Sequence, residues 1–386
     1  MQKLYETQDK PKKAFLVSII NDKKSESQSR ELRGLAETLG LEIASHEKIR
    51  VREKSPRYGM GSGKAEELTR KAADLKADLM VFDWNPSPSQ QRNWEELSGI
   101  PVVDRQELII RIFADRATTR EAELQVKLAE LSYFLPSLTH KYIDLSRQRG
   151  GRYGTKGSGE TKLETDRRKI EKRIHQLEKE VELVRKQRQM QRRQRERNNL
   201  PVCAIVGYTN AGKSSLLNAL TGAAVLAEDK LFVTLDAVTR RFQPSPGVSV
   251  LLTDTVGFIR DLPHSLIKAF RSTLEEAALA DIIIHIMDAS DPDVESNYNT
   301  TISVLKELGA ENIPMITLLN KIDKLQITES KEQLTENNEQ RTESNEGMAV
   351  LEELSNLFPD SIAVSVKEGR GLELLKERIV SYIMKL

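Results

Sequence analysis

Apolar residues at the start of the chain form short runs separated by amphipathic stretches. The runs at 13–20 and 78–83 predict buried strands, and 41–52 predicts another. Helical spacing at 26–40 and 64–77 predicts helices between them. Strands that alternate with helices are typical of a parallel sheet. The pattern therefore predicts a small N-terminal parallel α/β domain.

The same alternation returns after residue 200. The predicted strands of this region are 202–206, 248–257, 281–290, 313–323 and 361–369, with a closing helix at 371–385. Residues 231–241 are expected to form a loop-like connection. Residues 326–348 are polar and low in aromatic residues, so they are expected to be a disordered insertion. The region therefore predicts a second α/β domain.

Two heptad patterns occupy the region between these domains. Apolar residues recur at alternating spacings of four and three from Leu124 to Leu138 and again from Ile170 to Val184. This spacing predicts helices that pair along one seam. A glycine-rich segment at 147–162 separates the two rows, so the chain is expected to reverse there and form an antiparallel two-helix coiled coil.

Charge is distributed unevenly among these regions. The whole chain of 386 residues has a net charge of +1, but residues 141–200 contain 19 Lys and Arg against 9 Asp and Glu. That segment carries +10, which leaves −9 for the remainder. We therefore predict three domains: an N-terminal α/β domain at 1–115, a basic helical linker with a glycine-rich tip at 116–200, and the second α/β domain at 201–386. The linker is expected to bind a polyanion.

Composition excludes several classes of protein. Cys203 is the only cysteine, so no disulfide forms within the chain and a reducing compartment is favoured. The N-terminal apolar run at 14–20 has seven residues, too few for a signal peptide. No stretch reaches the ~18 apolar residues of a membrane span. We expect a cytoplasmic protein without stable membrane insertion.

The segment GYTNAGKS at 207–214 matches the phosphate-loop pattern G-x-x-x-x-G-K-[ST]. It follows a predicted strand and precedes a helical pattern. Gly207 and Gly212 allow the backbone to approach phosphates closely, and the helix N-terminus favours an anion. Lys213 supplies a positive charge to the outer phosphates. The Ser214 hydroxyl is a candidate Mg²⁺ ligand.

Further motifs follow in the order expected for a GTPase. Thr234, in LFVTLD, is predicted to complete the Mg²⁺ site and touch the γ-phosphate, with Thr239 as the alternative. Asp254 ends a predicted strand and is expected to hold the metal through water. The Gly257 amide is expected to reach the γ-phosphate.

The last two motifs predict guanine recognition. In Asn320-Lys321-Ile322-Asp323, the carboxylate of Asp323 accepts from guanine N1–H and N2–H₂, and adenine lacks this pair of donors. The backbone amides of Ser365-Val366-Lys367 are expected to contact the guanine base. GTP and GDP are thus the predicted substrate and product.

The predicted site contains catalytic, metal-binding and nucleotide-binding residues. The catalytic residues are Lys213, Thr234 and Gly257, and the metal ligands are Ser214 and Thr234. The nucleotide-binding residues are Gly207, Tyr208, Thr209, Asn210, Ala211, Gly212, Lys213, Ser214, Ser215, Phe232, Val233, Thr234, Leu235, Asp236, Asp254, Thr255, Val256, Gly257, Asn320, Lys321, Ile322, Asp323, Ser365, Val366 and Lys367.

Two side chains bear on hydrolysis. Phe258 follows Gly257, where many GTPases have a glutamine that orients water. An apolar ring cannot do this, so hydrolysis is expected to be slow and to depend on a partner. Asn210 resembles the residue by which some GTPases recruit K⁺.

Two glycine-rich segments outside the phosphate loop are open to more than one interpretation. The linker tip at 147–162 contains five glycines, five basic residues and Tyr153, which suits phosphate contacts and base stacking. The alternative is a solvated linker loop. GMGSGK at 59–64 is either a plain glycine turn or a loop that binds an anion or enters an RNA crevice.

The whole chain resembles the HflX family of ribosome-associated GTPases, which are related to translation factors. The resemblance is carried by GGRYGTKGSGETKLETDRRKI within 147–170, GYTNAGKS, LFVTLDAVTR and DTVGF. It implies an N-terminal α/β domain, a helical linker and a G domain. It also implies binding to the large ribosomal subunit, with ribosomal RNA near the peptidyl-transferase centre as the contact, and splitting of stalled or idle ribosomes under stress. We expect a monomer with no DNA partner.

The chain departs from the family pattern in two respects. Many family members carry a further C-terminal domain, whereas here the chain stops at the closing helix, and the insertion at 326–348 is long. Two other functions remain open. One is a GTPase in ribosomal RNA maturation or ribosome assembly, and the other is a signalling GTPase with a coiled-coil protein-binding module. A linker charge of +10 argues against the second.

Overall fold

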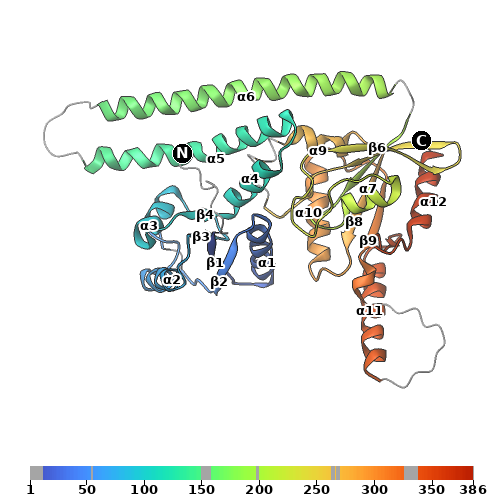
Figure 1. Cartoon of the computed structure of the whole chain (residues 1–386), viewed down its shortest axis with the longest axis horizontal. Helices are drawn as coiled ribbons and strands as arrows, with labels where there is room; N and C mark the ends of the chain where they lie inside the picture. The colour runs from blue at the N-terminus through green and yellow to red at the C-terminus, as the bar shows by residue number, and fades with distance from the viewer. Residues whose placement is uncertain are drawn as a thin grey trace. The chain divides into compact units, whose positions relative to one another are not determined.

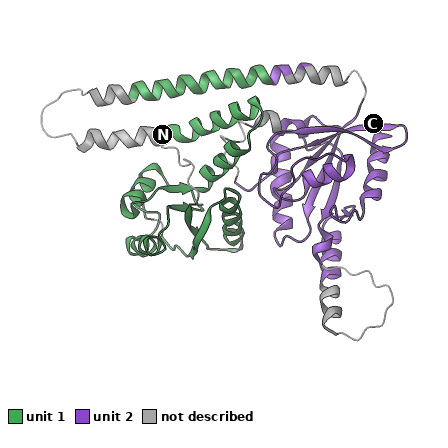
Figure 2. Ribbon diagram, in the orientation of Figure 1, with its two compact units in different colours: residues 1–184, 263–269 green, residues 185–262, 270–386 purple. Residues whose placement is uncertain are grey.

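The computed structural model describes residues 12–53, 55–148, 158–196, 200–261, 266, 270–325 and 338–385 (Figure 1). The chain forms two compact units (Figure 2). The first contains residues 1–184 and 263–269, and the second contains residues 185–262 and 270–386. No helix among the described residues is long and apolar enough to cross a membrane.

The first unit is built on a four-stranded parallel sheet with strand order β2-β1-β3-β4, which confirms the predicted parallel α/β domain. Its strands are β1 (Lys13–Ile19), β2 (Glu42–Ile49), β3 (Leu79–Phe82) and β4 (Val102–Asp104), and its helices are α1 (Lys23–Thr38), α2 (Ser62–Asp74), α3 (Pro88–Ser98) and α4 (Arg105–Arg116). The central strands are buried because their apolar runs are covered on both faces.

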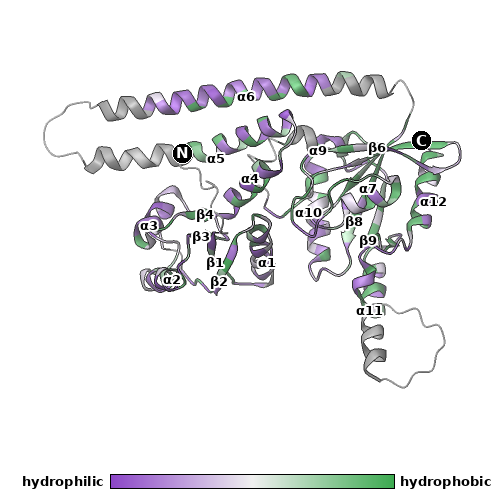
Figure 3. Cartoon of the chain, viewed as in Figure 1, coloured by the Kyte–Doolittle hydropathy of each residue, from purple (hydrophilic) through white to green (hydrophobic). Residues whose placement is uncertain are grey.

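Two long helices follow, α5 (Arg120–Gln148) and α6 (Ser158–Glu196), and they run in opposite directions (Figure 1). The predicted helical pair is therefore present. Pro136 lies inside α5. Figure 3 shows that α6 is mostly hydrophilic, and its buried or half-buried apolar residues follow the heptad: Ile170, Ile174, Leu177, Val181 and Val184. The centre of the predicted tip, 149–157, lies outside the described residues.

The second unit contains a six-stranded mixed sheet with strand order β10-β9-β8-β5-β7-β6, in which β6 alone runs antiparallel to its neighbour. The strands are β5 (Val202–Val206), β6 (Val238–Ser245), β7 (Val248–Asp254), β8 (Ile282–Asp288), β9 (Met315–Asn320) and β10 (Ile362–Ala363). The helices are α7 (Lys213–Thr221), α9 (Arg271–Ala278), α10 (Val294–Glu307), η1 (Ile322–Leu325), α11 (Asn338–Leu357) and α12 (Leu372–Ile383).

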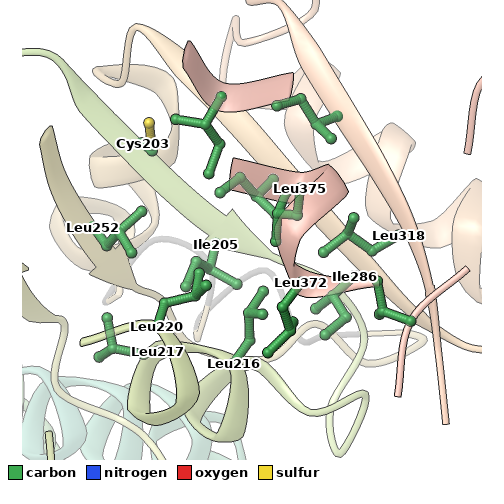
Figure 4. Packing of buried hydrophobic residues seen from close by; sticks show 14 of the residues in the cluster. Cys203, Ile205, Leu216, Leu217, Leu220, Leu252, Ile286, Leu318, Leu372 and Leu375 are labelled. Carbon is green, nitrogen blue, oxygen red and sulfur yellow. The ribbon is translucent and has the colours of Figure 1, made fainter. Parts of the chain in front are cut away.

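The core of this unit lies between the sheet and helices α7 and α12. Figure 4 shows Ile205 of β5, Leu216 of α7 and Leu375 of α12 in one cluster. All three side chains are fully buried. Each comes from an apolar run or stripe that the sequence pattern identified, so the strongest hydrophobic signals of the sequence form this core.

Two predictions about this unit were wrong in part. Strand β6 begins at Val238, inside the loop expected at 231–241, because an edge strand with exposed Arg240 and Arg241 lacks a strong apolar pattern. Helix α11 begins at Asn338, inside the insertion expected to be disordered. Its C-terminal half carries the buried Leu354, and this anchor supports a helix that extends into polar sequence.

Candidate nucleotide-binding site

The phosphate loop connects the C-terminal end of β5 to the first residue of α7, as its sequence pattern requires. Gly207 has φ 155° and Gly212 has φ 104°. A Cβ on Gly207 would lie 2.2 Å from the carbonyl oxygen of Ile286, and one on Gly212 would lie 2.4 Å from Nδ2 of Asn320. Neither glycine can therefore be replaced without displacing a neighbour.

Lys213 is enclosed by the phosphate loop. Its Nζ donates to the carbonyl oxygens of Tyr208 at 2.7 Å and Gly207 at 3.2 Å. Burial lowers the pKa of the Lys213 amine to about 8; the charge of Asp254 opposes this shift and that of Lys321 adds to it. The amine is thus held beside the loop amides, where phosphate oxygens bind in proteins of this type.

Three oxygen-bearing side chains from separate elements meet beside the loop. The Ser214 hydroxyl lies 2.6 Å from the Thr234 hydroxyl and donates to Oδ2 of Asp254 at 2.6 Å. Burial raises the pKa of Asp254, while Lys213 and the hydrogen bonds from Ser214 and Thr234 oppose this shift. Its other oxygen, Oδ1, is buried and makes no hydrogen bond of good geometry within the described part of the chain. Such a set of hard oxygen donors fits Mg²⁺.

The alternative threonine is used elsewhere. Thr239 lies in β6, and its hydroxyl is 3.0 Å from that of Thr253 on β7. Its side chain therefore joins two strands of the sheet, whereas Thr234 lies beside Ser214. This difference favours Thr234, and not Thr239, as the threonine that completes the predicted Mg²⁺ site.

The segment after β7 lies directly on the phosphate loop. The Thr209 amide donates to the Phe258 carbonyl at 2.7 Å, and the Phe258 amide donates to the Gly207 carbonyl at 3.1 Å. A Cβ on Gly257 would lie 2.8 Å from Cα of Thr209 and 2.9 Å from Nζ of Lys213. The ring of Phe258 is fully buried. The phosphate loop therefore contacts the backbone of this segment, whereas the Phe258 ring points into the protein interior.

Asn320 connects the phosphate loop to the loop that is predicted to back the base. Its Nδ2 donates to the Ala211 carbonyl at 2.9 Å, and its Oδ1 accepts from the Val366 amide at 3.1 Å. The next residue, Lys321, donates to the Asn210 carbonyl at 2.8 Å and pairs with Asp288 at 2.7 Å. The two ends of the site are thus joined by hydrogen bonds through adjacent residues.

The predicted base-reading carboxylate is oriented by a buried serine. The Ser365 hydroxyl donates to Oδ1 of Asp323 at 2.7 Å and accepts from the Glu368 amide at 3.2 Å. Ser365 is fully buried, and Asp323 is half-buried. The hydrogen bond from Ser365 fixes the orientation of the carboxyl group that is predicted to accept from guanine N1–H and N2–H₂.

A pocket opens between the phosphate loop and the segment before β6. Its lining includes ten predicted residues: Thr209, Asn210, Gly212, Lys213, Ser214, Ser215, Phe232, Val233, Thr234 and Gly257. Three further residues line it that the sequence reasoning missed: Ala227, Glu228 and Lys230. They belong to an irregular polar segment without a motif, so no signal identified them.

Several predicted residues do not line this pocket. Thr255 donates its hydroxyl to the Ile205 carbonyl at 2.7 Å, so it holds two strands together. Leu235, Val256 and Ile322 are buried apolar side chains, and Lys367 is exposed. Any role of these four residues in nucleotide binding therefore falls to their backbone or, for Lys367, to an exposed side chain.

Asn210, which lines the pocket, contacts the segment at 227–230. Its Nδ2 donates to Oδ1 of Asp229 at 2.7 Å. This hydrogen bond is the main reason that the pKa of Asp229 is lowered, and Lys321 and Lys324 lower it further. Asn210 itself has φ 62°, a left-handed conformation that asparagine tolerates.

A phosphate loop, a hydroxyl–carboxylate cluster beside it and an NKxD segment at the end of β9 together define a P-loop GTPase domain. Three family models match the chain in succession: "GTP-binding GTPase N-terminal" at 26–114, "GTP-binding GTPase Middle Region" at 116–195 and "50S ribosome-binding GTPase" at 202–321.

The relatives agree with this class. The GTPase HflX of Akkermansia muciniphila is 44% identical over 334 residues, covering 83% of this chain and 76% of the relative. That of Escherichia coli K12 is 40% identical over 329 residues, covering 85% and 77%. A crystal structure of SsGBP in complex with GDP matches with a TM-score of 0.51 and 26% identity over 97% of this chain and 99% of that one. The chain belongs to the HflX family of GTPases.

Proposed function

We propose that this GTPase binds the large ribosomal subunit and separates the subunits of stalled or idle ribosomes under stress. The observation that carries the proposal is the match of residues 202–321 to a family described as 50S ribosome-binding GTPases. The net charge of +10 over 141–200 supports a polyanionic partner. The proposed contact is ribosomal RNA near the peptidyl-transferase centre, reached by the N-terminal domain at 1–115 and the linker at 116–200, with nucleotide binding in 201–386.

The geometry supports specific roles for the site residues. Lys213 and the loop amides hold the phosphates, and Asp323, oriented by Ser365, reads guanine. Ser214 and Thr234 would hold Mg²⁺ directly, with Asp254 acting through water. Mg²⁺ would supply positive charge to the phosphates in the transition state. Thr234 and the Gly257 amide are the proposed γ-phosphate contacts.

A monovalent cation is a further proposed component. Asn210 donates Nδ2 to Asp229, so the other end of its amide is a carbonyl oxygen, which is a ligand type that K⁺ accepts. The residue lies on the pocket lining beside the phosphate loop. A K⁺ there would add positive charge next to the phosphates in a site where Phe258 supplies no polar group.

We propose that the protein works as a cytoplasmic monomer.

The nucleotide is proposed to control ribosome binding. The γ-phosphate ties Thr234 and Gly257 and so orders two segments that GDP leaves loose. A ligand shifts an equilibrium only by its different affinity for the two states. GTP should therefore tighten ribosome binding by about 1–3 kcal/mol relative to GDP, the usual range of coupling free energies.

Sedimentation of the protein with intact ribosomes and with isolated subunits tests the proposal. With a non-hydrolysable GTP analogue, we expect binding to the large subunit and a rise in free subunits, and with GDP we expect release. Thr234→Ala is expected to lose most of the difference between the two nucleotides. Reversing the charges of Arg149, Arg152 and Lys156 should weaken binding without changing GTP affinity. Equal affinity and equal splitting with GTP analogue and GDP would refute nucleotide control.

The same experiment separates the other functions. Binding restricted to immature large subunits would favour a role in ribosomal RNA maturation. An absence of sedimentation with any ribosomal particle would leave a signalling GTPase. Binding to ribosomal RNA also predicts a steep fall of log K with log salt, which a protein-binding coiled coil does not require.

A further inference from the structure

Arg260 is an arginine inside the G domain, three residues after Gly257. Its side chain is only 4% exposed. A guanidinium remains charged in proteins, so burying it is costly unless it is paired and hydrogen-bonded. The contacts that justify its burial therefore indicate what the residue does.

Both ends of Arg260 are held by different elements. Its backbone amide donates to the hydroxyl oxygen of Tyr208 in the phosphate loop at 3.0 Å, and its guanidinium lies 6.0 Å from the centre of the Tyr208 ring. On the other side, Nη2 donates to Oδ1 of Asn297 on α10 at 2.8 Å and lies 3.8 Å from Oδ2 of Asp293. The residue thus ties the segment after Gly257 to the phosphate loop and to α10.

The acceptor on α10 is itself fixed in orientation. Nδ2 of Asn297 donates to Oδ2 of Asp291 at 2.9 Å, so its Oδ1 is turned toward Arg260. Oδ1 of Asp291 accepts from the Asp293 amide at 2.9 Å. Asn297 is buried, which protects these bonds from exchange with water. The anchor of Arg260 is therefore a preorganised network and not a single contact.

We propose that Arg260 is a positioning residue for GTP hydrolysis. Because Phe258 is apolar and buried, this segment presents its backbone to the phosphate loop. The Phe258 amide and carbonyl bond to Gly207 and Thr209, and Gly257 faces Lys213. Arg260 fixes the position of this backbone because it anchors the chain two residues after Phe258. A displacement of about 1 Å in such a segment costs up to about 100-fold in rate.

Single-turnover GTP hydrolysis by the protein alone tests the proposal, so the result does not depend on ribosome binding. Arg260→Lys keeps the charge but loses the planar fork, Asn297→Ala removes its acceptor, and Tyr208→Phe removes one oxygen atom. Each should lower the hydrolysis rate by about 10- to 100-fold, with little change in GDP affinity. Asn299→Ala, on the exposed face of the same helix, is the matched control and should hydrolyse GTP like the wild type.

Hydrogen exchange of the peptide that covers residues 253–261 distinguishes positioning from a general structural role. The proposal predicts faster exchange in this peptide, with exchange in the rest of the G domain and the melting temperature unchanged in Tyr208→Phe. Unchanged hydrolysis in both Arg260→Lys and Tyr208→Phe would overturn it. Slower hydrolysis accompanied by faster exchange throughout the domain would also overturn it, because Arg260 would then only support the core.

Discussion

Two glycine-rich segments of this chain follow a strand and open a helix, yet they differ in every contact that matters. The segment at 207–214 opens α7, and its Gly207 and Gly212 leave no room for a Cβ. The segment at 59–64 opens α2, and a Cβ on Gly61 or Gly63 would have no atom within 4 Å. Only in the first segment would a Cβ on a glycine overlap a neighbouring atom.

The lysines of the two segments differ in the same way. Lys213 is buried and donates to two loop carbonyls, whereas Lys64 is half-exposed and pairs with Glu67 on its own helix at 2.9 Å. A phosphate loop is thus defined by glycines that let the backbone curl around a buried cation. The contrast favours the interpretation of 59–64 as a glycine turn, which spacing in the sequence could not decide.

The largest expected effect comes from removing Lys213. Lys213→Ala should weaken GTP and GDP binding by about 10- to 100-fold, since a charged hydrogen bond to phosphate contributes about 1.5–3 kcal/mol. Lys64→Ala is the matched control and should leave the affinity unchanged. Titration with a fluorescent guanine nucleotide measures both. A comparable loss in Lys64→Ala would show that the first unit also holds the nucleotide.

Adding a methyl group to each segment should give effects of opposite sign. Gly212→Ala should destabilise the nucleotide-free G domain by about 1–3 kcal/mol, because φ is 104° and the new Cβ meets Asn320. Gly63→Ala should stabilise the first unit by about 0.5–1 kcal/mol, because Gly63 lies in the first turn of α2 with open space around it. Thermal unfolding of the two variants provides the comparison. A destabilised Gly63→Ala would mean that 59–64 is also closely packed.

The smallest expected effect is an uptake of protons when GDP binds. Burial lowers the pKa of Lys213 to about 8, so at pH 8.5 most of the nucleotide-free protein carries a neutral amine there. Bound phosphate favours the charged form, so GDP binding at this pH should take up a fraction of a proton. Calorimetry in buffers of different ionisation enthalpy measures this uptake. Lys213→Arg, which stays charged, should lack it, and equal uptake in both proteins would contradict the argument.

The lowered pKa of Lys213 also makes the free energy of unfolding depend on pH in a defined direction. The unfolded chain protonates this lysine below its ordinary pKa of 10.5, whereas the folded chain does so only below about 8. Between these values the unfolded state binds more protons, so the contribution of Lys213 to the free energy of unfolding rises with pH. The difference between wild type and Lys213→Met isolates this contribution from those of other groups.

The sequence predicted most of this architecture because its strongest patterns are local. The apolar runs that became β5 and β9 lead directly into motif residues, so the strand pattern and the motif support the same prediction. Strand β6 was missed because an edge strand with a polar face lacks such a run. Its pairing with β7 is local, because Ser245 and Val248 pair across a turn at Pro246 and Gly247, and this turn signal could have indicated a hairpin.

The candidate site likewise contains residues that motifs identify and residues that only the fold places there. Lys213, Ser214 and Asp254 were identified from motifs, and the structure brings them together. Glu228 and Lys230 line the pocket without any sequence pattern, because a loop is placed by what it packs against. Motifs therefore identify the residues that are predicted to bind phosphate, whereas the residues that cover the pocket are placed by the fold.

Asn320 gives the site a fixed length. One side chain amide joins the Ala211 carbonyl of the phosphate loop to the Val366 amide of the segment predicted to contact the base. Because both bonds are made by one short, buried side chain, the phosphate end and the base end cannot separate or approach without breaking one of them. The protein itself therefore fixes the separation between the two ends of the predicted nucleotide site.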